Sequence, residues 1–212
     1  MCKLARFTFT TFWSVATLLL AARTVPAADI YTIDPAHTSI VFSVAHSGLS
    51  YTYGFFREAS GTYLIDKSNL DNSRFRLVIK ANSLDTNNLK RDTHLRGPDY
   101  FDVQQFPDIT FESIKCVATK TQDGGALFQL TGKLTMHGVT LQIDNIPLRM
   151  LGEGEGPYKD HRSGFLCQIE LKRSEFGMSY LVKEKLVGDA VGITVSFEGV
   201  LQEQPAAAPR TQ

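Results

Sequence analysis

The residues that could catalyse a reaction or bind a metal are few, and their spacing fits no common site. His37 and His46 are nine positions apart, so in an extended strand they point to opposite faces. His94, His137 and His161 are widely separated, and no cysteine stands at a metal-ligand spacing from them. The sequence also lacks the Gly-x-Ser-x-Gly, Gly-Lys-Ser/Thr and His-Glu-x-x-His motifs. We therefore expect no catalytic set, cofactor or metal, although residues distant in sequence could still converge on a metal.

Two cysteines, Cys116 and Cys167, lie within expected strands, and a third, Cys2, lies in the leader described below. An exported chain can form disulfides, but two cysteines are too few for a disulfide-stapled scaffold. Unpaired cysteine behaves as a small apolar residue. We expect Cys116 and Cys167 to be free and buried, with a bridge between them as the alternative.

Residues 1–27 have the three parts of a secretory signal peptide. Lys3 and Arg6 precede an apolar stretch over residues 9–22, and Val25-Pro26-Ala27 supplies a cleavage site. The stretch is interrupted by hydroxyl residues and is shorter than the ~20 apolar residues that span a bilayer. We expect cleavage after Ala27 and export of a product that is not an integral membrane protein, with an uncleaved anchor as the alternative.

The charge balance bears on the kind of partner. The chain has 212 residues, with 22 basic and 22 acidic side chains. The leader holds Lys3, Arg6 and Arg23 and no acid, so the remainder carries 19 basic residues against 22 acidic ones. A nucleic-acid-binding domain would show a basic surplus, so we expect no nucleic acid partner. Length and composition fit one soluble globular domain, which we place at residues 28–202.

Apolar residues recur with a period of two through this domain, as expected for half-buried antiparallel strands. About eight such strands are separated by turn residues, for example at 123–125, 137–138 and 152–157. Eight strands close well into an antiparallel barrel that can hold one small ligand, and an open sandwich is the alternative. We expect one short helix over residues 87–95, a strand of poor alternation over 109–119, and a disordered tail over 203–212.

The inward phase of these strands is rich in aromatic and aliphatic side chains. They could fill the barrel as a solid core or line a cavity, and the alternation does not distinguish the two. If a cavity exists, the period of two selects its lining. The expected lining residues are Phe42, Val44, Phe55, Tyr63, Phe75, Leu77, Phe128, Leu130, Phe165, Ile169, Val195 and Phe197.

Several ordered motifs give the chain a family resemblance from about residue 30 to 201. They are Asp34-x-x-His37-x-x-Ile40-x-Phe42-x-Val44-x-His46, Thr86-x4-Arg91-Asp92-x-His94-Leu95, Tyr100-Phe101-Asp102, Gly132-x-Leu134-Thr135-x-His137-Gly138, and Lys172-Arg173-Ser174-Glu175-Phe176-Gly177-Met178. In these the chain resembles the YceI-like family of exported bacterial proteins. The resemblance implies a lipocalin-like barrel whose tunnel binds a polyisoprenoid or similar long-chain amphiphile, and it supplies no catalytic set.

The first functional hypothesis is a periplasmic carrier of an isoprenoid or other long-chain lipid, without catalysis. An anionic head group would meet His46 at its strand end and the basic set Arg91, His94 and Arg173. The second hypothesis is an enzyme or redox partner that acts on an isoprenoid lipid or quinone through these same residues. The third is a stress-related envelope protein with a filled barrel. The sequence leaves the oligomeric state open, with a homodimer and a monomer as the alternatives.

Overall fold

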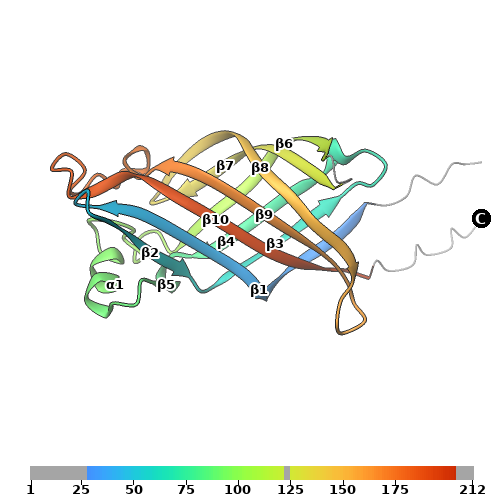
Figure 1. Cartoon of the computed structure of the whole chain (residues 1–212), viewed down its shortest axis with the longest axis horizontal. Helices are drawn as coiled ribbons and strands as arrows, with labels where there is room; N and C mark the ends of the chain where they lie inside the picture. The colour runs from blue at the N-terminus through green and yellow to red at the C-terminus, as the bar shows by residue number, and fades with distance from the viewer. Residues whose placement is uncertain (1–27, 122–124, 204–212) are drawn as a thin grey trace, which may run out of the picture.

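The computed structural model describes residues 28–121 and 125–203, and within these ranges eight strands form a closed antiparallel barrel (Figure 1). The order around the barrel is β1, β3, β4, β6, β7, β8, β9 and β10, and pairing of β10 with β1 closes the ring. Because β1 and β10 pair along most of their length, the open sandwich is excluded and the predicted barrel is confirmed. The bounds are β1 Asp29–His46, β3 Ala59–Ile65, β4 Arg74–Lys80, β6 Asp108–Lys120, β7 Ala126–Met136, β8 Val139–Glu155, β9 His161–Lys172 and β10 Val187–Leu201.

Two further strands extend one side of the barrel. The first part of β1 pairs with β3, whereas its last part pairs with β2, Ser50–Phe56. The short strand β5, Leu84–Asp85, pairs in turn with β2. The sequence did not reveal these additions, because the alternation over residues 55–65 suggested one continuous strand. In the structure the pairing is interrupted at Arg57 and Glu58, between β2 and β3, which run in the same direction along β1.

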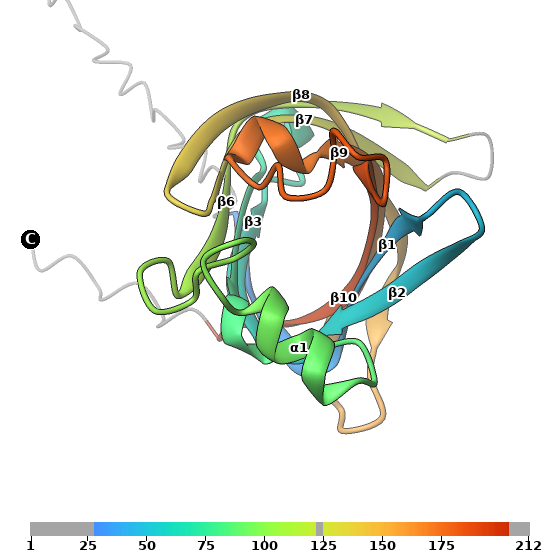
Figure 2. The same cartoon turned by 90° about the vertical axis from the view of Figure 1, so that its left-hand side faces the viewer.

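The short predicted helix is present as α1, Leu89–Leu95. Asn88 caps its N-terminus, because the Asn88 side chain accepts a hydrogen bond from the backbone N–H of Arg91 at 3.0 Å. Figure 2 looks into the barrel from the end that carries α1. Three 3-10 turns complete the described elements: η1 Leu70–Asn72, η2 Ala81–Ser83 and η3 Arg173–Phe176.

A β-bulge explains the poor alternation of β6. The pairing of β6 with β7 shifts register between Ser113 and Lys115, so Ile114 is an extra residue and is 44% exposed. Ser113 and Cys116 both lie on the buried face, although three positions separate them. The prediction of a loop at residues 152–155 is also wrong, since β8 continues through them to Glu155.

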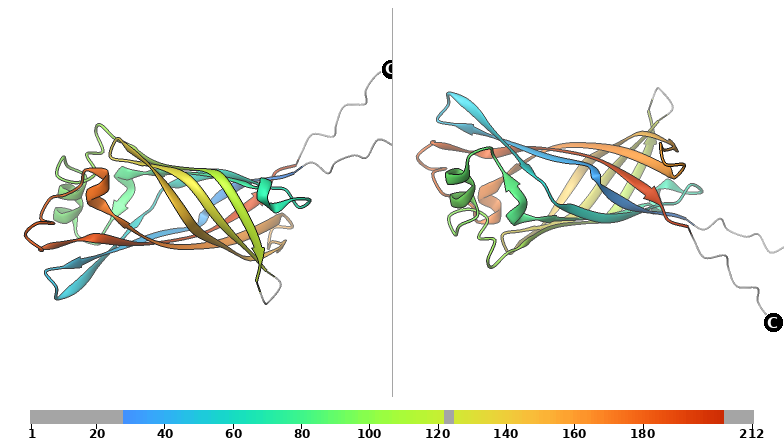
Figure 3. Two further views of the ribbon diagram at one scale, coloured as in Figure 1. Left: turned by 90° about the horizontal axis from the view of Figure 1, so that it is seen from above. Right: turned by 90° about the horizontal axis from the view of Figure 1, so that it is seen from below.

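The start and the end of the domain lie at the same end of the barrel. The start of β1 and the end of β10 lie together at the end opposite α1, where the N–H of Gln202 donates to the carbonyl of Ile30 at 2.8 Å (Figure 3). The two ends of the domain are therefore close to each other. The expected signal peptide, residues 1–27, and residues 204–212 of the expected tail lie outside the described residues.

Both remaining cysteines are free and buried, as the sequence predicted. The Cys116 thiol lies 3.6 Å from the carbonyl oxygen of Leu70, and Cys167 faces the barrel interior. Burial raises the pKa of each thiol to about 11, so neither is a reactive thiolate at neutral pH.

Candidate functional site: an apolar cavity with a polar rim

A cavity of about 400 Å³ occupies the barrel interior on the side of α1. Its walls are almost wholly aliphatic and aromatic. Its rim is formed by the end of β1, by α1 and by the segment that joins η3 to β10, which contribute His46, Arg91, His94, Tyr180 and Leu181. A concave apolar site with a few polar groups at one end is the usual form of a small-molecule pocket.

Most of the lining agrees with the sequence prediction. The reason is that inward residues of neighbouring strands lie opposite one another. Phe42 of β1 lies opposite Gly54 and Ile193. Val195 of β10 lies opposite Ile40 and Cys167. Nine of the twelve expected residues border the cavity: Phe42, Val44, Tyr63, Phe75, Leu77, Leu130, Ile169, Val195 and Phe197.

Phe42 reaches into the cavity because its partner on β2 has no side chain. A Cβ atom at Gly54 would overlap the Phe42 ring, because the far end of the ring occupies the space over the glycine. Phe42 also contacts Phe56, with 5.4 Å between the ring centroids. Phe56 in turn meets the edge of Phe101 at 5.5 Å, which continues the aromatic wall toward the rim.

Three expected lining residues lie elsewhere. Phe55 was assigned to the wrong face: it is 37% exposed on the outside of β2, under the guanidinium of Arg57, and Phe56 lines the cavity in its place. The interruption at Arg57 and Glu58 between β2 and β3 shifts the alternation, so the phase of β3 does not carry back to Phe55. Phe128 and Phe165 do point inward, but they are fully buried beneath the cavity and do not border it.

All four expected head-group residues border the cavity. Arg91 is oriented by Thr86, because its Nε donates to the Thr86 hydroxyl and its Nη2 to the Thr86 carbonyl, both at 2.7 Å. Among the described residues Arg91 forms no ion pair with the neighbouring Asp92, whose carboxylate accepts from the backbone N–H of Thr86 at 3.0 Å. His46 has no side-chain hydrogen-bond partner among the described residues, so its ring is free to meet a ligand.

Arg173 borders the cavity, but its main role is structural, because it binds backbone carbonyls. It is 6% exposed, and its donors go to the backbone: Nε to Gly188 at 2.8 Å, Nη1 to Met178 at 2.7 Å, and Nη2 to Tyr180 and Val187 at 2.8 and 3.1 Å. Burial lowers the pKa of this guanidinium. Arg173 therefore fastens the rim segment 178–188 with most of its hydrogen-bonding capacity.

An aromatic group that the sequence analysis missed completes the rim. The rings of His94, Tyr100 and Tyr180 meet edge to face, with centroids 5.2 to 5.6 Å apart. The His94 Nε2 lies 2.9 Å from a carboxylate oxygen of Asp99, and the guanidinium of Arg173 lies over the Tyr100 ring. Tyr100 stands in a motif that the sequence analysis singled out without giving it a role, whereas no local pattern marks Tyr180.

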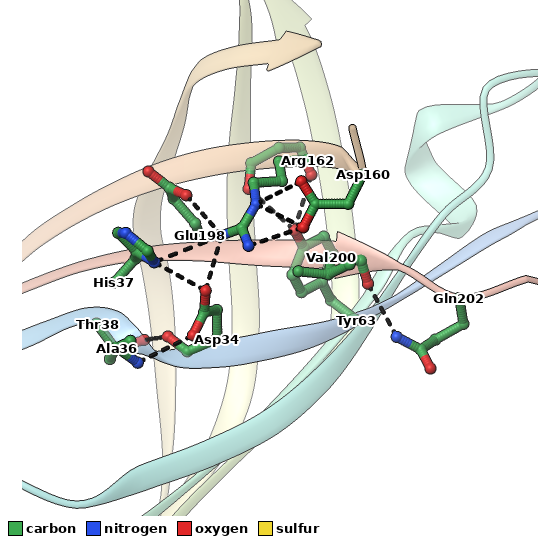
Figure 4. A network of polar contacts seen from close by, with 11 residues as sticks. Asp34, Ala36, His37, Thr38, Tyr63, Asp160, Arg162, Glu198, Val200 and Gln202 are labelled. Atoms are coloured by element: carbon green, nitrogen blue, oxygen red, sulfur yellow. Dashed lines mark hydrogen bonds and ion pairs between the residues drawn. The ribbon is translucent and has the colours of Figure 1, made fainter. Parts of the chain in front are cut away.

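The opposite end of the barrel holds a network of ion pairs around Arg162 (Figure 4). Arg162 donates to Asp34 at 2.7 Å, to Asp160 at 2.8 Å and to Glu198 at 3.0 Å. The pairing of β1 with β10 is interrupted between Ile33 and Thr38, and these bonds join β1, β9 and β10 across that gap. Hydrogen bonds from Arg162 and His37 hold the pKa of Asp34 at about 2. None of these side chains borders the cavity, so the network fastens strands.

In residues 28–121 and 125–203 no group of three or more His, Cys, Asp or Glu side chains is arranged to hold a metal ion. The same ranges contain no helix with the length and apolar character needed to cross a membrane.

Comparison with known proteins agrees with this architecture. The UPF0312 protein of Azotobacter vinelandii is 34% identical over 194 residues, which cover 89% of this chain and 95% of that protein. Protein YceI of Salmonella arizonae is 31% identical over 193 residues, covering 90% of this chain and 96% of the relative.

Solved structures share the fold. BcnA of Burkholderia cenocepacia has a TM-score of 0.66 at 21% identity and covers 78% of this chain and 98% of its own. A polyisoprenoid binding domain from Saccharophagus degradans has a TM-score of 0.61 at 18% identity and covers 81% and 98%. The model of the YceI-like domain matches residues 31–199, which span the barrel from β1 to β10, and the chain therefore belongs to the YceI-like family.

Proposed function

We propose that this protein is a periplasmic binding protein that carries a polyisoprenoid or similar long-chain amphiphile, without catalysis. One observation carries the proposal: a cavity of about 400 Å³ has almost wholly aliphatic and aromatic walls, and its rim carries the polar side chains of His46, Arg91 and His94. Such a site suits a ligand with a long apolar chain and a polar head. The description of the Saccharophagus degradans neighbour as a polyisoprenoid binding domain supports the same ligand class.

The energetics of the cavity support binding without a reaction. Removing apolar surface from water contributes ~25 cal/mol per Å², before the costs of association, so a buried chain can supply the affinity. At depth the cavity offers no group suited to acid–base chemistry. Burial raises the pKa of Cys167 to about 11, and the Tyr63 hydroxyl is already hydrogen-bonded to Ser163.

The rim supplies contacts for the head group. Among the described residues, the Nη1 of Arg91 and the ring nitrogens of His46 have no hydrogen-bond partner, and both side chains border the cavity. A cation and an imidazole at this position suit a phosphate or carboxylate while the chain lies below them. Of the four residues expected at the head group, Arg91 and His46 are therefore the ones we propose for direct contact.

The test is recovery of the bound lipid. The protein is purified from the periplasmic fraction of its native host, extracted with organic solvent, and the extract is analysed by mass spectrometry. An intact prenyl or other long chain at a stoichiometry near one supports a carrier. A chemically altered product would overturn the absence of catalysis, and recovery of no lipid would overturn the carrier itself.

A matched pair of variants locates the binding site. Val195→Trp fills the cavity, whereas Val117→Trp makes the same change on the outer face of β6, where Val117 is 41% exposed. We expect the lipid to be lost from Val195→Trp and retained by Val117→Trp. Full retention by Val195→Trp would place the lipid outside the cavity.

A further inference from the structure

Six aromatic rings close the cavity at its inner end, and they form two layers that we call the aromatic floor. The upper layer, Tyr63, Phe75 and Phe197, borders the cavity. The lower layer, Tyr31, Phe128 and Phe165, is 0% exposed and does not border it. The barrel is therefore hollow on the side of α1 and solid on the side of the chain ends.

Each ring of the upper layer rests on a ring of the lower layer. Tyr63 stacks on Tyr31, with centroids 4.8 Å apart and planes 6° from parallel. Phe197 stacks on Phe165 at 5.3 Å, and Phe75 meets Phe128 edge to face at 5.6 Å. Such pairs favour defined geometries, so removing a lower ring lets the upper ring sink.

Hydrogen bonds fix the two tyrosines in the aromatic floor. The Tyr63 hydroxyl donates to the carbonyl of Ser163 at 3.1 Å and lies 2.7 Å from its hydroxyl. The Tyr31 hydroxyl donates to Glu153 at 3.0 Å, and the same carboxylate receives Lys67 at 2.7 Å and His161 at 2.8 Å. Swinging either ring aside would leave a buried polar group unpaired, which opposes opening of the floor by a ligand.

The depth above the floor follows from strand geometry. Eight residue steps separate Val187, opposite His46 at the rim, from Val195, the last inward residue of β10 before Phe197. At ~3.3 Å per residue and a tilt of ~40°, this gives a depth of about 20 Å. One leaflet of a bilayer's hydrocarbon core is ~15 Å thick, which is about the length of one membrane-lipid tail. The depth of the cavity is therefore enough for one chain of about that length.

We propose that the aromatic floor sets the chain length that the protein accepts. Chains up to about the length of a geranylgeranyl tail are buried whole, whereas the end units of a much longer prenyl chain stay outside the barrel. Affinity then rises with chain length only until the tail reaches Phe197 and Phe75. This inference rests on the proposed function and narrows its ligand class.

Equilibrium binding of radiolabelled farnesol, geranylgeraniol and solanesol to the purified protein tests the inference. For the unaltered protein we expect affinity to rise about tenfold from farnesol to geranylgeraniol and then to stop rising or to fall for solanesol. Binding of none of the three alcohols would refute the proposed function. Binding that strengthens steadily through solanesol would refute only the role of the floor.

Three variants test the mechanism. Phe165→Leu thins the lower layer, and we expect the affinity for solanesol relative to geranylgeraniol to rise at least tenfold. Phe176→Leu is the matched control, because Phe176 is also 0% exposed and does not border the cavity but packs at the rim end, so the ratio should not change. An equal ratio in both variants would overturn the inference.

Leu130→Phe works in the opposite direction and keeps the test valid if Phe165→Leu does not fold. Leu130 borders the cavity one inward position above Phe128 on β7, so a ring there raises the floor without removing a contact. We expect geranylgeraniol binding to weaken about tenfold and farnesol binding to stay unchanged. An equal loss for both alcohols, or no loss for either, would overturn the inference.

Discussion

Replacing Arg173 by lysine should destabilise the fold while keeping its charge. The guanidinium makes four hydrogen bonds to backbone carbonyls around segment 178–188 through three nitrogens, and it is 6% exposed. A lysine ammonium is a single point and can reach about one of these positions, so about three bonds are lost. At ~1–1.5 kcal/mol for each bond, with buried carbonyls left unpaired, Arg173→Lys should cost about 3–5 kcal/mol.

The loss is measurable because the total stability of a domain is ~5–15 kcal/mol. Urea unfolding followed by far-UV circular dichroism gives the free energy of unfolding, with Arg149→Lys as the control. The Arg149 side chain is exposed and has no hydrogen-bond partner among the described residues, so its replacement should cost less than ~0.5 kcal/mol. If Arg173→Lys costs no more than Arg149→Lys, the interpretation of Arg173 as the fastener of the rim is refuted.

Three further predictions concern acid stability, packing and thiol access. The pKa of Asp34 is about 2 in the folded state against an ordinary 3.8, so its pairing with Arg162 stabilises the fold above pH ~4 and is lost as pH falls toward 2. Asp34→Asn should therefore flatten the fall in free energy of unfolding over that range, and an unchanged slope would contradict this. Gly54→Ala should lower the melting temperature by overlapping the Phe42 ring, and Phe42→Leu should recover part of the loss in the double variant, whereas simple addition of the two losses would contradict the overlap. Both buried thiols should resist iodoacetamide in the folded protein and react fully in urea, as mass spectrometry will show, and rapid labelling without urea would contradict their burial.

The phase of most strands could be predicted from sequence, because the side-chain period of a strand is two. Eleven of the twelve expected lining residues point inward, and the exception has a local cause. Phe55 precedes the interruption between β2 and β3, which breaks the alternation that its assignment assumed. The same limit applies at β6, where the extra residue Ile114 changes the phase without any proline or glycine to mark it.

The depth of a residue along the barrel axis could not be predicted in the same way. Phe128 and Leu130 share the inward phase of β7, but Leu130 borders the cavity and Phe128 lies in the aromatic floor. Which of them meets empty space depends on strand tilt and on the register between neighbouring strands. These are long-range properties, so the sequence left a solid core and a cavity as equal alternatives, and the structure contains both.

The roles of the basic residues also needed the structure. Arg91 lies in the first turn of α1 and Arg173 begins η3, and both were expected at a head group. Carbonyls of segment 178–188 converge on Arg173, whereas Arg91 meets Thr86 through only two of its three guanidinium nitrogens. No local sequence pattern predicts that convergence, because every residue type has a backbone carbonyl.

The polar groups at the two ends of the barrel differ in whether they are already paired. This difference determines the orientation that we expect for a ligand. At the closed end the polar groups satisfy one another, since Glu153 receives three donors and Arg162 meets three carboxylates. At the open end the ring nitrogens of His46 and the Nη1 of Arg91 have no hydrogen-bond partner among the described residues. A charged head at the closed end would have to displace existing ion pairs, whereas at the rim it gains new ones. We therefore expect an amphiphile that enters this barrel to place its chain toward the aromatic floor and its head at His46 and Arg91.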